Sequence, residues 1–173
     1  MILLLGAAAE RADGPSAARR LLALGVRERW GLAFLPELAR APGGKPFFPA
    51  FPQYRFNLTH TDGLCLCALS EAEVGVDAER VRPRRAGLPR YVMNDEEFAA
   101  FDGTWADFAR VWTLKEAYCK YLGRSIWPPR TVPVPPPVPY RTYEGDGWRA
   151  ALCGTEALPP VIRMVSLDRK SVV

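Results

Sequence analysis

The sequence has few of the residues that metal and redox sites use most often. It holds one histidine and four cysteines in 173 residues. The cysteines lack the paired spacing of a zinc site: Cys65, Cys67, Cys119 and Cys153. We therefore expect free, buried thiols in a reducing cytoplasm rather than a disulfide framework. The Walker pattern of P-loop nucleotide-binding proteins is also absent.

Long hydrophobic runs and lysines are equally scarce. The opening run 2–9 is too short to span a membrane and no basic residue precedes it, so it predicts a buried strand and no membrane partner. Of 23 basic residues only four are lysines, Lys45, Lys115, Lys120 and Lys170, against 19 acidic residues and a net charge of +4. This small surplus favours an acidic partner and argues against a dedicated nucleic-acid binder.

The pattern along the chain predicts a mixture of helices and strands. Segments with helical signals are 16–30 with Ser16 as N-cap, 94–101, and 106–122 ending at Gly123. Segments with strand character are 64–70, 74–79 beside it, 147–153 and 161–167. Loops are predicted by glycine and proline in 41–55, by five arginines in 80–90 and by seven prolines in 128–139.

Two carboxylates alternate along the expected strand 74–79. A period of two points Asp77 and Glu79 from one face, while Val74, Val76 and Ala78 share the other. Two acids this close repel each other unless a cation lies between them, and hard oxygen ligands suit Mg²⁺. The alternative is a solvated strand edge with two surface acids.

A third acid lies beside the apolar stripe of the helix 106–122. The stripe is defined by residues at helical spacing: Trp105, Phe108, Trp112, Cys119 and Leu122. Glu116 borders it, Lys120 follows one turn later, and Lys115 adds a second cation. Such an acid and lysine are often only a surface pair, but next to an aromatic face they indicate a site.

Two further segments carry groups suited to phosphate. Thr59, His60 and Thr61 form a cluster of hydrogen-bond donors at the end of a strand, although a lone histidine is more often structural. The loop 43–46, with Lys45 and Pro46, allows close approach of the backbone to a ligand and carries a cation at its tip.

Four motifs follow one another in the sequence: G-K-P, F-N-L-T-H-T, G-V-D-A-E and W-T-L-K-E-A-Y-C-K. In this order they resemble the motifs of the 4′-phosphopantetheinyl transferases of the Sfp type, in the larger W/KEA branch. The resemblance implies transfer of 4′-phosphopantetheine from coenzyme A to a serine of an apo carrier protein, which is acidic, with release of 3′,5′-ADP. We expect an α+β fold of two pseudo-symmetric α/β lobes, residues 1–73 and 74–173, with the site between them, in a cytoplasmic monomer.

The same resemblance implies a role for each motif residue. The family's Mg²⁺ ligands are matched by Asp77, Glu79 and Glu116. Glu116 also matches the base that accepts the proton of the serine hydroxyl. Lys120 matches the lysine that neutralises charge on the transferred phosphoryl group. The residues that would bind coenzyme A are Arg19 (with Arg20 as its rival), Lys45, Pro46, Thr59, His60, Lys115 and Lys120.

Other functions stay open at this point. One alternative is a non-catalytic relative that binds a carrier protein or a coenzyme A-like nucleotide. A nucleic-acid binder using 80–90 is disfavoured, because the net charge is small and that loop has no stacking aromatics. The loop is either a docking surface for the carrier or a solvated connection. The chain is shorter than typical family members at both ends, and the family's N-terminal basic helix is expected to be absent.

Overall fold

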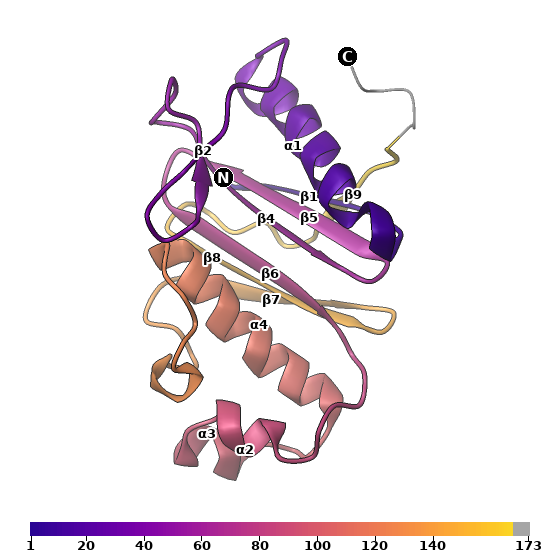
Figure 1. The fold of residues 1–173 in the computed structure, drawn as a ribbon, viewed down its shortest axis with the longest axis vertical. Helices are drawn as coiled ribbons and strands as arrows, with labels where there is room; N and C mark the ends of the chain where they lie inside the picture. Colours follow the sequence, from indigo (N-terminus) through magenta and orange to yellow (C-terminus); the bar gives the residue numbers. More distant parts are fainter. Residues whose placement is uncertain (168–173) are drawn as a thin grey trace.

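Two β-sheets pack against each other between two long helices in the computed structural model of the protein, which describes residues 1–167 (Figure 1). The first sheet has the order β4-β5-β1-β9 and the second β6-β8-β7. The strands are β1 Leu3–Ala7, β4 Arg55–Thr61, β5 Leu64–Ser70, β6 Val74–Arg80, β7 Tyr140–Gly145, β8 Trp148–Gly154 and β9 Arg163–Met164, with a small pair β2 Ala39–Arg40 and β3 Pro46–Phe47. The expected α+β class is confirmed.

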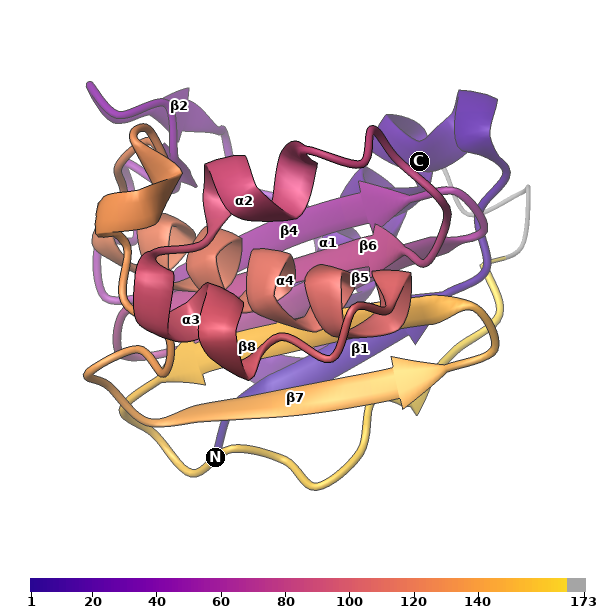
Figure 2. The same cartoon turned by 90° about the horizontal axis from the view of Figure 1, so that it is seen from below.

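The helices cover the outer faces of the two sheets. Helix α1 packs on the first sheet and α4 on the second, while the short α2 and α3 lie against α4 (Figure 2). The bounds are α1 Gly14–Trp30, α2 Leu88–Val92, α3 Asp95–Ala100 and α4 Trp105–Leu122, with single 3₁₀ turns η1 Arg11–Asp13 and η2 Pro129–Thr131. Residues 1–167 include no helix long and apolar enough to cross a membrane.

The helix boundaries follow local signals, with one correction. As the sequence predicts, α4 ends at Gly123, whose φ of 67° favours glycine, and a helix starts at Asn94. The structure adds a capping box between Asn94 and Glu97 at the start of α3. The expected N-cap Ser16 is wrong, because α1 begins at Gly14 with Asp13 in the N-cap position. Pro15 occupies the first turn, where its missing N–H is tolerated.

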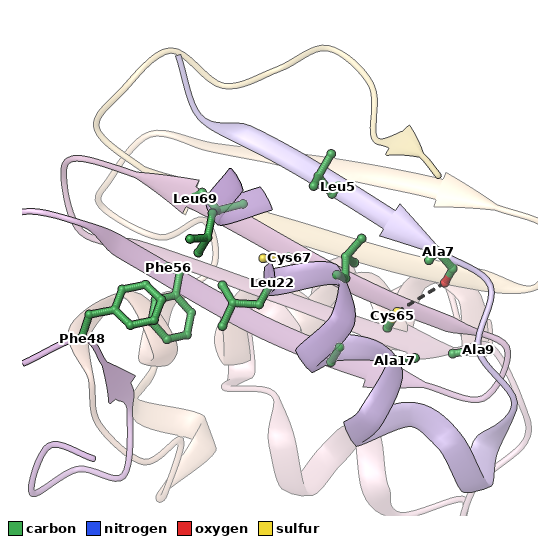
Figure 3. Packing of buried hydrophobic residues seen from close by; sticks show 13 residues of the cluster. Leu5, Ala7, Ala9, Ala17, Leu22, Phe48, Phe56, Cys65, Cys67 and Leu69 are labelled. Carbon is green, nitrogen blue, oxygen red and sulfur yellow. Dashed lines mark hydrogen bonds between the residues drawn. The ribbon is translucent and has the colours of Figure 1, made fainter. Parts of the chain in front are cut away.

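The core between α1 and the first sheet contains two of the four cysteines. Leu22 of α1 lies near Cys67 of β5, and the rings of Phe48 and Phe56 pack at a tilt of 35° with their centroids 4.5 Å apart (Figure 3). All four cysteines are free and buried, which confirms the expectation of buried free thiols. Burial raises the pKa of Cys65 to about 11, so this thiol stays protonated at neutral pH.

The position of β6 differs from the sequence prediction. It was expected beside β5, yet its ladder partner is β8 and it belongs to the second sheet. It still runs along β4, where alternate side chains on one face of β4 bond to it. Asn57 Oδ1 accepts from the Val76 N–H at 2.8 Å, and Thr61 Oγ1 accepts from the Arg80 N–H at 3.1 Å. Polar side chains therefore join the two sheets at this seam.

The apolar stripe predicted for α4 is wrong in part. Phe108 and Cys119 are buried, but Trp105 and Trp112 are half-buried and Leu122 is 45% exposed. The second sheet covers one side of α4, while α2, α3 and the proline-rich segment 128–139 cover another. A helix packed on two sides does not follow a single-stripe pattern.

One carboxylate, Glu156, fastens the segment after β8 to the first sheet. Its Oε1 accepts from the Ser70 hydroxyl and the Glu71 N–H, both at 2.6 Å, and its Oε2 lies 3.1 Å from the amino group of Met1. Burial opposes the charged form, but the hydrogen bonds from Ser70 and Glu71 and the positive amino group outweigh it. Together they lower the pKa of Glu156 to about 2.

We expect Glu156→Gln to destabilise the protein in a pH-dependent way. Because the folded-state pKa is below the ordinary value, the charged group stabilises the fold above about pH 4.5 and loses this effect as the pH falls toward 2. The difference in unfolding free energy is at most about 3 kcal/mol at pH 7 and less than half of that at pH 3. Urea unfolding of the wild type and the variant at both pH values measures this difference in free energy, and Glu37→Gln, at an exposed position, is the control. An equal difference at both pH values would contradict the assignment.

Candidate active site

Six of the residues singled out in the sequence lie around one pocket. The pocket has a volume of about 380 Å³ and opens where β4, β6 and α4 meet. Its polar lining is Thr59, His60, Asp77, Glu79, Glu116 and Lys120. Leu58, Ala78 and Trp112 complete the wall. Three carboxylates and one lysine, separated by up to 43 positions in the sequence, therefore share one cavity, which we call the acidic pocket.

Asp77 is the most firmly held of the three acids. Its Oδ1 accepts a hydrogen bond from the Lys120 ammonium at 2.7 Å and another from the Thr59 hydroxyl at 3.1 Å. Lys120 also donates to the Val76 carbonyl at 3.3 Å. Asp77 is 6% exposed and Thr59 is equally buried. Both donors use the same carboxylate oxygen, so the orientation of the Asp77 carboxylate is fixed.

The other two acids carry the electrostatic signature of a crowded site. Burial raises the pKa of Glu116, and the charges of Asp77 and Glu79 raise it further against the opposing effect of Lys120. Burial also raises the pKa of Glu79, and Asp77 adds to this, while Arg84 opposes it through an ion pair. Like charges that face one another in a pocket favour the binding of either protons or a cation.

The donor set fits a hard divalent cation. Carboxylate oxygens from β6 and α4 are the ligands that Mg²⁺ prefers, and Mg²⁺ commonly uses a few carboxylates together with water or phosphate. Within residues 1–167, no three acidic, histidine or cysteine side chains are drawn together into a complete metal cage. Asp77 and Glu79 are instead paired with Lys120 and Arg84. The chemical type of the pocket, rather than a closed cage, supports a metal here.

His60 connects the acidic pocket to the start of α1. A side chain at Gly14 would place its Cβ 2.8 Å from His60 Nδ1, so the imidazole packs directly on the first turn of this helix. The helix N-terminus adds partial positive charge on that side. The combination gives the pocket an edge suited to an anion.

Lys45 and Pro46 line neighbouring pockets rather than the acidic one. A pocket of about 210 Å³ contains both residues together with Leu58 and Lys120, and therefore borders the acidic pocket. The Lys45 ammonium bonds to Glu73 and to the Val74 carbonyl, at 2.8 and 2.9 Å. Burial lowers the pKa of Lys45 despite this carboxylate. Lys45 thus anchors the loop 41–47 to the start of β6.

A larger pocket, of about 600 Å³, also includes Lys45 and Pro46. Tyr54, Arg55 and Tyr121 line it, but none of the three carboxylates of the acidic pocket does. Size therefore does not identify the site: the smaller pocket has the groups that carry chemistry.

Lys115 points away from the acidic pocket. It is fully buried, its ammonium pairs with Glu97 at 2.7 Å, and it donates to the carbonyls of Pro129 and Val132 at 3.1 and 2.5 Å. These partners belong to α3 and to the proline-rich segment. In this structure Lys115 joins those elements to α4, although its neighbour Glu116 faces the pocket.

The two arginines of α1 also lie apart from the acidic pocket. Arg19 is exposed, whereas Arg20 is half-buried and donates to Asp13 at 2.7 Å. Arg20 lines a separate pocket of about 540 Å³ with Asp13 and Ser16. Of the four lysines, Lys170 lies outside the described residues.

Three contributors to the site were missed in the sequence. Trp112 forms a wall of the acidic pocket, Arg84 pairs with Glu79, and Asn57 bonds β4 to β6. Asn57 was detectable, because it shares a strand face with Thr59 at a spacing of two. Arg84 could not be singled out, since the sequence does not distinguish which arginine of 80–90 pairs with Glu79.

The arrangement is suited to chemistry on a phosphate ester or anhydride. The carboxylates are of the type that binds a metal beside phosphates, Lys120 can offset negative charge, and Glu116 can accept a proton. Transfer of a phosphoryl group requires mainly such positioning and charge stabilisation.

Comparison with known proteins agrees with this chemistry. Residues 73–135 match the family model ACPS, described as the 4′-phosphopantetheinyl transferase superfamily. The chain is 39% identical over 119 residues to the 4′-phosphopantetheinyl transferase AcpT of Escherichia coli (strain K12), covering 58% of this chain and 60% of that protein. It is 37% identical over 126 residues to AcpT of Salmonella typhi, covering 67% and 66%.

A more distant relative extends the match. The 4′-phosphopantetheinyl transferase Sfp of Bacillus subtilis (strain 168) is 25% identical over 148 residues, which cover 72% of this chain and 66% of that protein. The matched region spans about 60% of the length of the Escherichia coli relative. The family match includes β6, α4 and the acids on both elements.

Proposed function

Because this chain carries a domain of the 4′-phosphopantetheinyl transferase superfamily, we propose that it transfers 4′-phosphopantetheine from coenzyme A to a serine of an apo carrier protein. The observation that carries the proposal is the acidic pocket, which unites Asp77, Glu79, Glu116 and Lys120. The pocket lies within the matched segment except for its wall from β4. The relatives are named 4′-phosphopantetheinyl transferases, which agrees with the group transferred in this proposal.

In the proposed reaction the serine oxygen attacks the β-phosphorus of coenzyme A, the one that carries the pantetheine. A new P–O bond forms to serine, the P–O bond of the pyrophosphate breaks, and 3′,5′-ADP leaves. The serine proton passes to the Glu116 carboxylate, whose pKa is raised by burial and by the neighbouring acids. A raised pKa suits a general base near neutral pH.

The remaining residues of the pocket would hold the phosphates and offset their charge. Asp77, Glu79 and Glu116 would bind Mg²⁺, which supplies positive charge to the pyrophosphate. Lys120 would lie against the transferred phosphoryl group, and its contact with Asp77 keeps the two charges balanced before substrate binds. His60, beside the N-terminus of α1, would face the 3′-phosphate.

We also propose which branch of the superfamily this protein belongs to, namely the two-lobed Sfp type. Its N-terminal lobe would be residues 1–73 and its C-terminal lobe residues 74–173. The protein would act as a cytoplasmic monomer. The start of β6 at Val74 supports that division, while β9 returns to pair with β1 of the first sheet. The alternative is a relative that binds a carrier without turnover; the complete set of acids with Lys120 favours the enzyme.

A coupled assay for 3′,5′-ADP tests the proposal. We expect release of 3′,5′-ADP from coenzyme A only when both an apo carrier protein and Mg²⁺ are present. Chelation with EDTA should stop the release, and added Mg²⁺ should restore it. Release at the same rate without a carrier would indicate a hydrolase instead.

Thr59→Val separates two roles for the Thr59 hydroxyl. Its hydrogen bond to Asp77 predicts a positioning role, so its loss should weaken Mn²⁺ binding about tenfold, measured calorimetrically, and leave the KM for coenzyme A within about twofold. Thr59→Ser keeps the hydroxyl and should restore metal binding. If Thr59 instead holds the 3′-phosphate, the KM for coenzyme A rises and Mn²⁺ binding does not change.

A further inference from the structure

The main-chain N–H and C=O groups of β6 point alternately to two neighbours. In an antiparallel pair only every second residue of a strand bonds through its main chain to the partner strand. Just after β6, the Val81 N–H donates to the Gly147 carbonyl at 2.8 Å, on the side of β8. With a period of two, the main chains of Asp77 and Glu79 share that side. The main chain of Ala78 therefore points the other way, toward β4.

Strand β4 runs beside this free edge of β6, and its side chains bond to the N–H groups there in a regular series (Figure 2). Asn57 accepts from the Val76 N–H at 2.8 Å, and the two residues are 19 positions apart. Thr61 accepts from the Arg80 N–H at 3.1 Å, again across 19 positions. These side chains replace the neighbouring strand that an edge strand lacks, so buried N–H groups on the edge are satisfied.

The middle member of this series is missing. The same offset would join Thr59 to the Ala78 N–H, but the Thr59 hydroxyl donates to Asp77 at 3.1 Å and does not bond to Ala78. Within residues 1–167 the Ala78 N–H has no other acceptor. Ala78 is only 3% exposed, and a buried backbone donor without a partner is uncommon in a folded protein. This N–H is therefore left for a ligand or for water.

The unpaired donor belongs to the wall of the acidic pocket. Ala78 lines this pocket, while its methyl group is part of the hydrophobic core that contains Val74 and Val76. Two residues earlier on the same edge, the Val76 carbonyl accepts from the Lys120 ammonium at 3.3 Å. The edge of β6 thus places a backbone N–H next to a cation inside one cavity. Such a pair of donors suits an anionic oxygen.

We propose that the Ala78 N–H donates a hydrogen bond to a phosphate oxygen of the substrate, next to the Lys120 ammonium. The inference rests on the proposed function for the identity of that substrate, whose pyrophosphate supplies the oxygen. The bound oxygen would complete the series of acceptors along β6. Because the pairing of β6 with β8 already holds this N–H in place, no rearrangement of the backbone is needed when the phosphate binds.

Amide hydrogen exchange of the wild-type protein, resolved by residue, tests the free and the bound states. Without ligand, the Ala78 N–H should exchange at least about tenfold faster than those of Val76 and Arg80, which are bonded to β4. Coenzyme A with Mg²⁺ should slow exchange at Ala78 about tenfold more than at these two positions, which report the stabilisation of the whole fold by the ligand. Slow exchange at Ala78 in the free protein, or equal slowing at all three positions, would overturn the proposal.

An ester in place of the amide between Asp77 and Ala78 removes this N–H and keeps the methyl group. We expect the affinity for coenzyme A, measured by calorimetry with Mg²⁺, to fall about tenfold, because a hydrogen bond to a charged oxygen is lost. An ester before Gly103, in the exposed loop ahead of α4, is the matched control and should bind like the wild type. Unchanged affinity with the ester at Ala78 would mean that this N–H binds water only, and would overturn the proposal.

Inorganic pyrophosphate separates this inference from the proposed function. If pyrophosphate with Mg²⁺ selectively slows exchange at Ala78 but no apo carrier protein is modified, the phosphate-binding N–H stands and the transferase proposal fails. If a carrier is modified while neither coenzyme A nor pyrophosphate selectively slows exchange at Ala78, the transferase proposal stands and the role of this N–H is overturned.

Discussion

Glu116→Gln is expected to lower the rate of phosphopantetheine transfer by about 10³-fold or more while the protein remains folded. The substitution keeps the size of the side chain but removes the only acid of α4 in the acidic pocket. Loss of a general base typically costs about 10²- to 10⁴-fold. In the proposed mechanism the same change also removes one carboxylate from the metal, so the two effects add.

Comparison with another glutamate makes this result specific. Glu96→Gln removes an exposed carboxylate of α3, outside the pocket, and should retain wild-type activity. Glu116→Gln should unfold at or above the wild-type urea midpoint, because Glu116 is electrostatically crowded and its neutralisation relieves repulsion from Asp77 and Glu79. Activity of Glu116→Gln within tenfold of the wild type would remove Glu116 from the chemistry.

Lys115→Met is expected to have the largest effect on stability. It removes the cation that pairs with the nearly buried Glu97 and bonds to the carbonyls of Pro129 and Val132. Removing one partner of a buried ion pair costs about 3–5 kcal/mol, because the other charge is left without compensation. Urea unfolding of the variant and the wild type at pH 7 measures the loss.

A double substitution tests the cause of that loss. Lys115→Met with Glu97→Gln removes both charges, so part of the lost stability should return. Residual folded protein should also bind coenzyme A with wild-type affinity, because Lys115 faces away from the acidic pocket. A stability change below about 1 kcal/mol together with a large rise in the KM for coenzyme A would contradict this and support a role for Lys115 at the nucleotide.

The contrast between Lys115 and Lys120 shows how far the sequence carries the prediction. Glu116 and Lys120 are one turn apart on α4, so helical geometry alone places them on one face. Lys115 precedes Glu116 by one residue, which turns it about 100° around the helix. Whether the Lys115 side chain then faces the ligand or the core depends on where α3 and the proline-rich segment pack. No local sequence pattern predicts that these two segments pack beside Lys115.

The strands show the same division between local and long-range information. Strand period alone predicts that Asp77 and Glu79 share a face, and both line the acidic pocket. The partner of β6 was not predictable in this way, because β8 lies about 70 residues later in the chain. The side-chain bond from Thr59 to Asp77 depends on that arrangement, since it requires β4 and β6 to run side by side in different sheets.

The most direct measurement is the intact mass of apo carrier proteins after incubation with this protein, coenzyme A and Mg²⁺. We expect a mass gain of one phosphopantetheine on at least one carrier of a panel, on its acceptor serine, and no gain with Glu116→Gln. A transferase such as the Bacillus subtilis relative serves as the positive control for each carrier. No gain on any carrier that the control modifies would contradict the proposed function.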